Sequence, residues 1–348
     1  MAATGQQAVT PERISALAWG YTAPLIVETA VRQNIFDLLD DGPKSIAELA
    51  ALTGASTRGL RAVLHALAGL NLLAKDAEGR FSLTAESAAF LVSTRPGYLG
   101  GLIRHTSTQL IPLWLKLNEI VVAGKPAAGV NQEGPGAEFF HEFVMDIFPM
   151  SYPSARALAA HLAEAESAGP RGHPKGQPSS ALDLAAGSGV WGIALAQAFP
   201  DLRVTAVDWP RVLDVTRQSV QRCGLAERFS LVPGDLLEAD FGSGHSVATL
   251  GHILHSEGQR RGRALLRKTF QALAPGGTIA IAEFLVSEDR SGPPNGLIFA
   301  VNMLVATDEG DTWSFPEIAR WLEEAGFENP RTLPAPGPSP LILANRPA

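Results

Sequence analysis

The stretch 183–196, DLAAGSGVWGIALA, decides the fold of the C-terminal half of this chain. It has the pattern of a strand end, a glycine-rich turn and the start of a helix. Gly187, Gly189 and Gly192 match the G-x-G-x-x-G spacing of dinucleotide-binding turns, in which backbone N–H groups and a helix N-terminus face a ligand. Helix–strand packing also selects glycine, so the spacing alone leaves NAD, another ligand or no ligand open.

The surroundings of this turn predict an α/β fold. Short β-rich runs alternate with helical segments, and the runs are ALDLAA, RVTAVD, FSLVPGD, SVATLGHIL and GTIAIAEFLV. Such alternation favours a mostly parallel sheet, Rossmann-like, with helices on both faces. The tail PRTLPAPGPSPLILANR is typical of two strands joined by a Pro-Gly turn, which would add an antiparallel terminal hairpin.

The first hundred residues are mainly helical with short breaks. Ser45 and Glu48 form a capping-box pattern, a second helix opens at Ser56 or Thr57 and runs to about Ala68, and Gly69 is placed to end it. LLAKDAEGRFSLT then alternates as a hairpin would. This order predicts a winged helix-turn-helix. We therefore expect a winged-helix domain at 1–100, a helical connector at 101–165, a linker at 166–180 and the α/β domain at 181–348.

Composition restricts the class of protein. The 348 residues are 46% hydrophobic and 18% charged, which is typical of a soluble globular protein with two domains. A net charge of −7 argues against a nucleic-acid or anionic membrane partner. Cys223 is the single cysteine and fits a reducing compartment. The N-terminus has no signal-peptide pattern and no uncharged apolar run approaches the roughly 20 residues of a membrane span, so we expect a cytoplasmic protein.

The winged helix raises a second class of function, a DNA-binding regulator. Arg58, Arg61 and His65 lie on the helix that would meet DNA. However, ELAALTG and DLLDDG add acids nearby, and the domain lacks a basic surface. The charge of this domain therefore argues against DNA binding.

Two acids near the glycine turn indicate the kind of ligand. Asp208 ends the second strand about 20 residues beyond the glycines, where a carboxylate can accept both hydroxyls of a ribose. Asp183 lies directly before the turn, where it would repel a pyrophosphate and attract a cationic amine. S-adenosylmethionine (SAM) has such an amine, a sulfonium and a ribose, and it has no phosphate.

These segments together resemble the SAM-dependent small-molecule O-methyltransferases of the hydroxyindole, caffeate and polyketide type. The resemblance rests on ALDLAAGSGVWGIALAQAFPDLRVTAVDWPRVLDVTRQSV, LVPGDLLEADFG, LGHILHSE, LRKTFQALAPGGTIAIAEF and FPEIARWLEEAGF. It covers nearly the whole chain, because members also carry an N-terminal winged-helix dimerisation domain. The family usually has D-x-G-G-G-x-G where this chain has Asp183-Leu-Ala-Ala-Gly-Ser-Gly189, and the two alanines narrow the room for the methionine end.

The resemblance implies a set of cofactor contacts for SAM and its product S-adenosylhomocysteine (SAH). Asp183, Gly187 and Gly189 would hold the methionyl part, and Asp208 would hold the ribose. Asp235 would accept a hydrogen bond from the adenine amino group, while Leu236 would pack on the face of the adenine and Trp209 beside it. We expect His252 to line the same cavity.

His255 is the candidate general base. The family places such a histidine at this strand end, usually followed by Asp-Trp or His-Phe, and here Ser256 and Glu257 follow. A positioning or pocket-lining role and a metal site shared with His252 are the alternatives, and we expect no metal. Glu283 lies where the family has one orienting acid. The second acid would fall near Thr312, so Asp311 is a possible substitute.

The acceptor pocket is predicted from apolar side chains at helical spacing, which would suit an aromatic or polycyclic small molecule. The predicted members are Phe143, Met145, Phe148, Met150, Phe299, Asn302 and Met303. Methylation of carbon or nitrogen by proximity stays open as an alternative to O-methylation. An NAD-dependent oxidoreductase would explain the glycine spacing, but it leaves Asp183 and Asp235 without roles. The resemblance also implies a homodimer, formed by the first domain through the apolar faces of ISALAWGYTAPLIVETAV.

Overall fold

The computed structural model describes residues 9–167, 178–337 and 339–348. The chain divides into two compact units, and the boundary falls between Leu110 and Ile111, ten residues after the predicted one. Most of the predicted linker at 166–180 lies outside the described residues.

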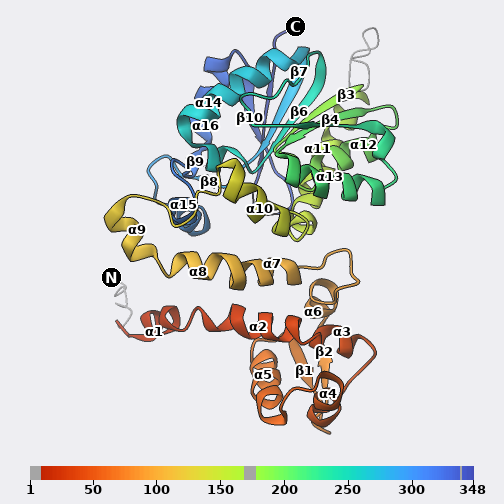
Figure 1. The fold of residues 1–348 in the computed structure, drawn as a ribbon, viewed down its shortest axis with the longest axis vertical. Coiled ribbons are helices and arrows are strands. Elements are labelled where there is room, and N and C mark those ends of the chain that lie inside the picture. The colour runs from red at the N-terminus through yellow and green to blue at the C-terminus, as the bar shows by residue number, and fades with distance from the viewer. Residues whose placement is uncertain (1–8, 168–177, 338) are drawn as a thin grey trace, which may run out of the picture. The chain divides into compact units, whose positions relative to one another are not determined.

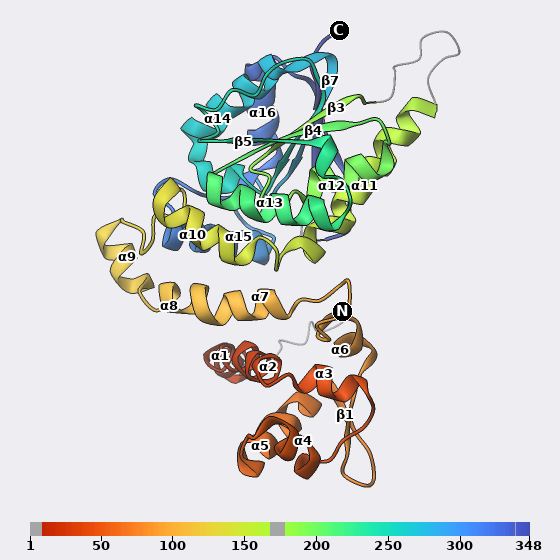
Figure 2. The ribbon, with the colours of Figure 1, turned by 45° about the vertical axis from the view of Figure 1, so that its right-hand side comes forward.

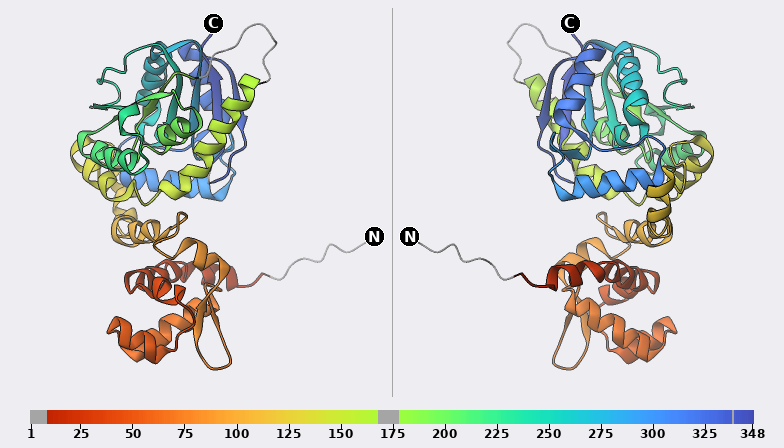
Figure 3. Two further views of the ribbon diagram at one scale, coloured as in Figure 1. Left: turned by 90° about the vertical axis from the view of Figure 1, so that its right-hand side faces the viewer. Right: turned by 90° about the vertical axis from the view of Figure 1, so that its left-hand side faces the viewer.

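The first unit is helical with one hairpin (Figures 1 and 3). Its two strands, β1 and β2, pair antiparallel, with Leu73 opposite Leu83. Phe81 of β2 and Leu64 of α5 are fully buried in its core. The elements are α1 (Glu12–Ala18), α2 (Thr22–Arg32), α3 (Ile35–Asp40), α4 (Ile46–Thr53), α5 (Thr57–Gly69), β1 (Leu73–Lys75), β2 (Phe81–Leu83), α6 (Ala85–Phe90), α7 (Gly100–His105) and a π-helical turn, Thr106–Leu110.

Local signals in this unit act largely as predicted. Ser45 and Glu48 form the capping box at the start of α4, and Ser56 caps α5. Gly69, however, is the last helical residue of α5, and Asn71 takes the left-handed conformation that ends the turn, with φ 59°. An asparagine can adopt this conformation, so the glycine is not required to stop the helix.

The N-terminal helices have one further feature. Of the described residues, the stretch Glu12–Arg32 is long and apolar enough, by length and composition alone, to cross a membrane. It contains large apolar side chains that are mostly exposed, including Leu17 at 69% and Trp19 at 68%. The core helix of a soluble protein and a signal sequence pass the same test.

The second unit is an α/β domain built on a seven-stranded sheet of order β10-β11-β7-β6-β3-β4-β5 (Figures 1 and 2). Neighbours from β7 to β5 pair in parallel, and β11 is antiparallel to both β7 and β10. The predicted parallel sheet and terminal hairpin are therefore confirmed. The strands are β3 (Ser180–Leu184), β4 (Arg203–Asp208), β5 (Phe229–Pro233), β6 (His245–Gly251), β7 (Leu273–Ala282), β10 (Glu328–Leu333) and β11 (Leu341–Asn345).

Helices cover both faces of this sheet (Figure 2). Ala181 and Val204 pack beneath α11 and α12, whereas Leu182 and Leu184 face α14 and α16, as the period of two along a strand requires. The helices are α8 (Ile111–Trp114), α9 (Leu117–Ala123), α10 (Glu133–Phe143), α11 (Phe148–Ser167), α12 (Val190–Ala198), α13 (Pro210–Arg222), α14 (Leu254–Ala272), α15 (Pro294–Ala306) and α16 (Phe315–Ala325), with a 3-10 turn, Ala226–Arg228.

The connectivity defines where a ligand can bind. β3 continues through helices to β4 and β5 on one side, and the chain then returns to β6 on the other side of β3. Open α/β sheets bind ligands outside the carboxyl ends of their strands at such a reversal. The short strand β8 (Leu285–Val286) follows β7 and pairs in parallel with β9 (Trp313–Ser314). This pairing holds the segment before Trp313 beside the chain that leaves β7.

Candidate active site

The glycine turn connects β3 to α12 through residues in the left-handed region. Ala185, Gly187 and Gly189 have φ of 53°, 56° and 76°. The N–H of Gly187 donates to Asp208 at 2.8 Å, and its carbonyl accepts from the Thr216 hydroxyl at 2.7 Å. The turn is therefore held from β4 and from α13, and Thr216 is a contributor that sequence reasoning missed.

The third glycine of the spacing has a packing role. A Cβ on Gly192 would lie 2.8 Å from the Val204 side chain and 3.1 Å from the Asp183 carboxylate. Only glycine therefore lets α12 lie this close to the sheet. The match to the dinucleotide pattern reflects a shared strand–turn–helix geometry, which says little about the ligand.

Asp183 is fully buried beneath the turn. One carboxylate oxygen accepts from the Gly192 N–H at 2.9 Å, and the other accepts from the Thr249 hydroxyl at 2.7 Å. Burial raises the pKa of Asp183 to about 7, with these two hydrogen bonds opposing the rise and the Asp208 charge adding to it. The carboxylate predicted to attract a ligand amine thus points to donors of the protein itself, one of them on neighbouring β6.

Asp208 ends β4 as predicted. Its carboxylate accepts from the N–H groups of Gly187 and Trp209, the latter at 2.7 Å. Burial raises the pKa of Asp208 to about 6, against the lowering effect of these two bonds. Each carboxylate oxygen of Asp208 accepts one hydrogen bond from the protein, so each can accept another from a hydroxyl of a ribose.

Trp209 lies against α10, with its ring centroid 6.2 Å from that of Phe140. Both pack on a small cluster formed by Val144, Val212 and Val215. A Cβ on Gly136 of α10 would lie 2.6 Å from the indole, so glycine there permits the close approach. The indole forms an apolar wall beside Asp208.

Asp235 follows β5 and is held from two sides. One oxygen accepts from the Leu237 N–H at 2.8 Å, and the other pairs with Arg261 at 2.7 Å. Leu236 is 8% exposed and belongs to the main core, so its side chain is largely taken up by protein packing. Arg261 is a second residue that sequence reasoning missed.

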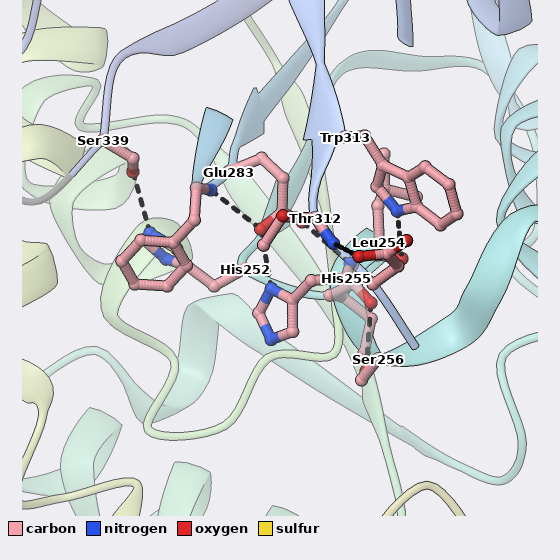
Figure 4. Close-up of polar contacts among 11 residues, drawn as sticks. His252, Leu254, His255, Ser256, Glu283, Thr312, Trp313 and Ser339 are labelled. Carbon is pink, nitrogen blue, oxygen red and sulfur yellow. Dashed lines mark hydrogen bonds and ion pairs between the residues drawn. The ribbon is translucent and has the colours of Figure 1, made fainter. Parts of the chain in front are cut away.

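His255 and Glu283 form the polar centre of the site (Figure 4). His255 lies in the first turn of α14, four residues after β6 ends, because His252 adopts φ 61° and turns the chain. Glu283 directly follows β7. The His255 Nδ1 lies 2.6 Å from one Glu283 oxygen, and the other oxygen accepts from the His255 N–H at 3.0 Å.

Glu283 is fully buried and ionised. Burial alone would raise its pKa, but the charge and hydrogen bond of His255, together with His252 and the Phe284 N–H, lower the pKa below its ordinary value. An ionised Glu283 accepts a hydrogen bond from the Nδ1–H of His255, which fixes the tautomer and leaves Nε2 as an acceptor. The geometry thus leaves one ring nitrogen of His255 without a bond to Glu283.

His252 has a different environment. Its Nε2 lies 2.9 Å from the Ser339 hydroxyl (Figure 4). Burial lowers its pKa to about 4, against the opposing charge of Glu283, so the ring is neutral at neutral pH. Within residues 9–167, 178–337 and 339–348, no group of three histidine, cysteine or acidic side chains is placed to hold a metal ion.

Asp311 contacts the His255 turn through its backbone. Its N–H donates to the His255 carbonyl at 2.9 Å, while its carboxylate accepts from the Thr312 N–H at 2.7 Å. A Cβ on Gly310 would lie 2.5 Å from the same carbonyl. This loop therefore supports the turn that carries His255, whereas the Asp311 carboxylate is used to shape its own loop.

Aromatic rings line one side of His255. The Phe299 ring meets the His255 imidazole edge-on, with the ring centroids 4.9 Å apart. The ring centroid of Phe284 lies 4.1 Å from that of Phe299, and Phe284 was not among the predicted site residues. Asn302, one turn further along α15, accepts from the Trp114 indole at 2.9 Å. Met303 is 5% exposed and packs inward.

The other predicted pocket residues have mostly structural contacts. The Met145 sulfur accepts from the Ser219 hydroxyl at 3.0 Å, which fixes it against α13. Phe148 stacks on Tyr152 at 5.3 Å. Phe143 packs 5.6 Å from Phe140, and Met150 is half-buried in α11. Of the predicted set, Phe299 is the member whose ring contacts the candidate base.

The acids and histidines thus meet at the carboxyl ends of adjacent parallel strands in a Rossmann-like domain, an arrangement of a cofactor-dependent transferase. The family model of the O-methyltransferase domain matches residues 177–328, and that of the O-methyltransferase dimerisation domain matches residues 15–93. The chain belongs to the O-methyltransferase family, whose members use SAM as methyl donor.

Individual relatives agree with this assignment. The chain is 30% identical over 330 residues to a 3-hydroxy-5-methyl-1-naphthoate 3-O-methyltransferase of Streptomyces sahachiroi, covering 93% of this chain and 91% of the relative. It is 29% identical to the tetracenomycin polyketide synthesis 8-O-methyl transferase TcmO of Streptomyces glaucescens, covering 97% of each. The solved structure of PigF with SAH, a methyltransferase of Serratia sp., matches with a TM-score of 0.79 at 26% identity, covering 97% of this chain and 100% of that one.

Proposed function

We propose that this enzyme methylates a hydroxyl group of an aromatic or polycyclic small molecule, with His255 as general base. The observation that carries the proposal is the buried His255–Glu283 pair, joined at 2.6 Å. Glu283 accepts from Nδ1 and stabilises the imidazolium that forms when Nε2 takes a proton. The relatives that act on a naphthoate and on a tetracenomycin polyketide support an aromatic acceptor.

The residues around the glycine turn fit SAM. Asp208 keeps free acceptor positions for ribose hydroxyls, and Asp235 keeps them for an adenine amino group. Acids end or follow neighbouring strands here, which would repel the pyrophosphate of NAD. Because both Asp183 oxygens bind protein donors, we propose that Asp183 fixes the turn of Gly187 and Gly189, which in turn meets the methionyl part. Bound SAM supplies an electrophilic methyl group on its sulfonium.

The chain's own residues then prepare the acceptor. Phe284 and Phe299 give His255 an apolar side that would orient an aromatic ring and exclude water. The loop of Gly310 and Asp311 holds the His255 carbonyl and so fixes where the imidazole points. Removal of the hydroxyl proton by Nε2 makes the oxygen a better nucleophile for in-line attack.

We further propose a homodimer formed through the N-terminal unit. The match to the dimerisation domain supports it, together with the exposed apolar side chains of α1, α2 and the turn between them: Ile14, Leu17, Trp19, Tyr21 and Leu25.

The base role is tested with His255→Ala and, as a matched control, His141→Ala, whose imidazole contacts a backbone carbonyl on α13. Turnover is measured by mass spectrometry with isotopically labelled SAM and a panel of hydroxynaphthoates and other phenols. Loss of a general base costs about 10²–10⁴-fold, so His255→Ala should lose that much turnover while its SAH affinity in calorimetry stays unchanged. Unchanged turnover would refute the base role and favour methylation by proximity. Binding of NADH in place of SAH would refute the cofactor.

A further inference from the structure

One guanidinium joins two acids at the edge of the site. Arg261, on α14, pairs through Nη2 with Asp235 at 2.7 Å and through Nε with Glu257 at 2.7 Å. The side chains of Arg261 and Asp235 are 26% and 29% exposed, whereas that of Glu257 is 6% exposed. The arginine therefore reaches from a buried anchor to a carboxylate that keeps access to solvent.

The two acids belong to different parts of the site. Asp235 follows β5, on the side proposed for adenine. Glu257 lies two residues after His255 and just before Gly258, whose φ of 69° interrupts α14. Glu257 is also where this chain departs from the Asp-Trp or His-Phe that usually follows the family histidine. The pair with Arg261 thus involves a position at which this chain departs from the usual family pattern.

A purely structural role for Arg261 explains its contact with Glu257 but not its contact with Asp235. Burial raises the pKa of Glu257 despite the opposing charge of Arg261, so this acid needs a cationic partner. Neutralising Glu257 requires Nε alone, yet the arginine also directs Nη2 to Asp235. With the Leu237 N–H on its other oxygen, Asp235 is fixed at both oxygens by donors, one of them charged.

Fixing both oxygens determines what Asp235 can recognise. An ionised carboxylate is an acceptor only, and its remaining positions suit a donor such as the 6-amino group of adenine. Hypoxanthine presents a carbonyl oxygen at that position and would meet the carboxylate without a hydrogen bond. A site built around a fixed polar group rejects the analogue that lacks the partner group, whereas a mobile carboxylate can turn away.

We propose that Arg261 is a positioning residue that makes the cofactor site selective for adenine over hypoxanthine, by holding Asp235 against the buried anchor Glu257. The proposal rests on the assignment of Asp235 to the adenine amino group under the proposed function.

The test compares the dissociation constants of SAH and S-inosylhomocysteine, measured by calorimetry with the full-length protein. Wild type should prefer SAH by about tenfold or more, the worth of one hydrogen bond to a charged group. Arg261→Met should bring the ratio close to one, and Arg261→Lys, which keeps the charge but reaches one acid at a time, should lie between. The matched control is Arg263→Met on the same helix, which loses only a pair with Glu324 and should keep the wild-type ratio.

Arg261→Met leaves Glu257 buried without its cation, so the double variant Glu257→Gln/Arg261→Met provides the same test without that charge. A double variant that binds SAH and keeps the wild-type ratio would overturn the role of Arg261. A wild type that binds both ligands equally would instead overturn the assignment of Asp235, and this proposal with it. The two failures are separated by whether wild type discriminates.

Discussion

Replacing Glu283 by glutamine tests the proposed base at its most buried contact. The carboxylate accepts three hydrogen bonds, with the His255 Nδ1 and the Phe284 N–H on one oxygen and the His255 N–H on the other. A glutamine has one oxygen to accept them. In its better orientation the oxygen keeps the two donors and the new NH₂ group faces the His255 N–H, so the variant loses one bond and the negative charge.

The size of the effect follows from that charge. Two unit charges about 4 Å apart interact by about 4 kcal/mol at an effective dielectric constant of 20. A neutral amide provides little of this stabilisation to the imidazolium that forms as the acceptor loses its proton. A loss of about 3–4 kcal/mol in the transition state corresponds to a rate lowered by about 10²–10³-fold.

The assay is the initial rate of methyl transfer from labelled SAM to a phenol that wild type accepts, with SAH affinity as the check on folding. Because the pKa of Glu283 lies below its ordinary value, the wild-type carboxylate stays ionised throughout a neutral assay range, and its own protonation does not complicate the comparison. Glu288→Gln, at an exposed position five residues away, serves as the control. If Glu283→Gln kept its rate within about threefold while binding SAH normally, the charge would not assist the transfer, and the reasoning would fail.

Two further predictions concern stability and assembly. Burial raises the pKa of Asp183 from 3.8 to about 7, so the native state holds a proton that the unfolded chain releases, and this group's contribution to stability falls as pH rises from about 4 to 7. The side chain of Asp183→Asn can accept from the Gly192 N–H and donate to the Thr249 hydroxyl, and it does not titrate. The free energy of unfolding of this variant, relative to that of wild type, should therefore rise by about 4 kcal/mol between pH 4 and pH 8. Urea unfolding measures this difference, and a difference independent of pH would contradict the prediction. Leu17→Glu on α1 should convert a dimer to a monomer in light scattering, whereas Leu52→Glu, also exposed on the first unit, should not; an unchanged dimer mass in Leu17→Glu would place the interface elsewhere.

Much of the site follows from rules that act over short stretches of chain. Strands alternating with helices predict a parallel sheet, and the carboxyl ends of parallel strands meet at one edge. This is enough to bring Asp208, His255 and Glu283 together, although they lie far apart in the chain. The glycine turn is equally local, since Gly187 and Gly189 adopt the left-handed conformation that a strand–turn–helix connection needs.

The directions of single side chains required the full structure. Asp183 lies opposite Thr249 in the pairing of β3 with β6, and this register brings the hydroxyl to the carboxylate. No local pattern gives a register between strands that are about 65 residues apart. The same limit applies to Met145, whose apolar character predicts burial but not that its sulfur would meet Ser219 on α13. Arg261 was missed because an arginine on a helix is ordinarily a solvent-facing residue.

The glycine spacing therefore does not identify the cofactor. Gly187 and Gly189 provide the turn, and Gly192 lets α12 pack on Val204, so the three glycines satisfy the backbone whatever the ligand is. Charge also bears on the ligand, because Asp183 lies near the end of β3 and Asp208 ends β4 beside the turn. A dinucleotide would place two phosphates against this field, whereas SAM places there an amine and hydroxyl groups. The same backbone geometry thus serves dinucleotide enzymes and methyltransferases, and the match to the O-methyltransferase family is what assigns SAM to this chain.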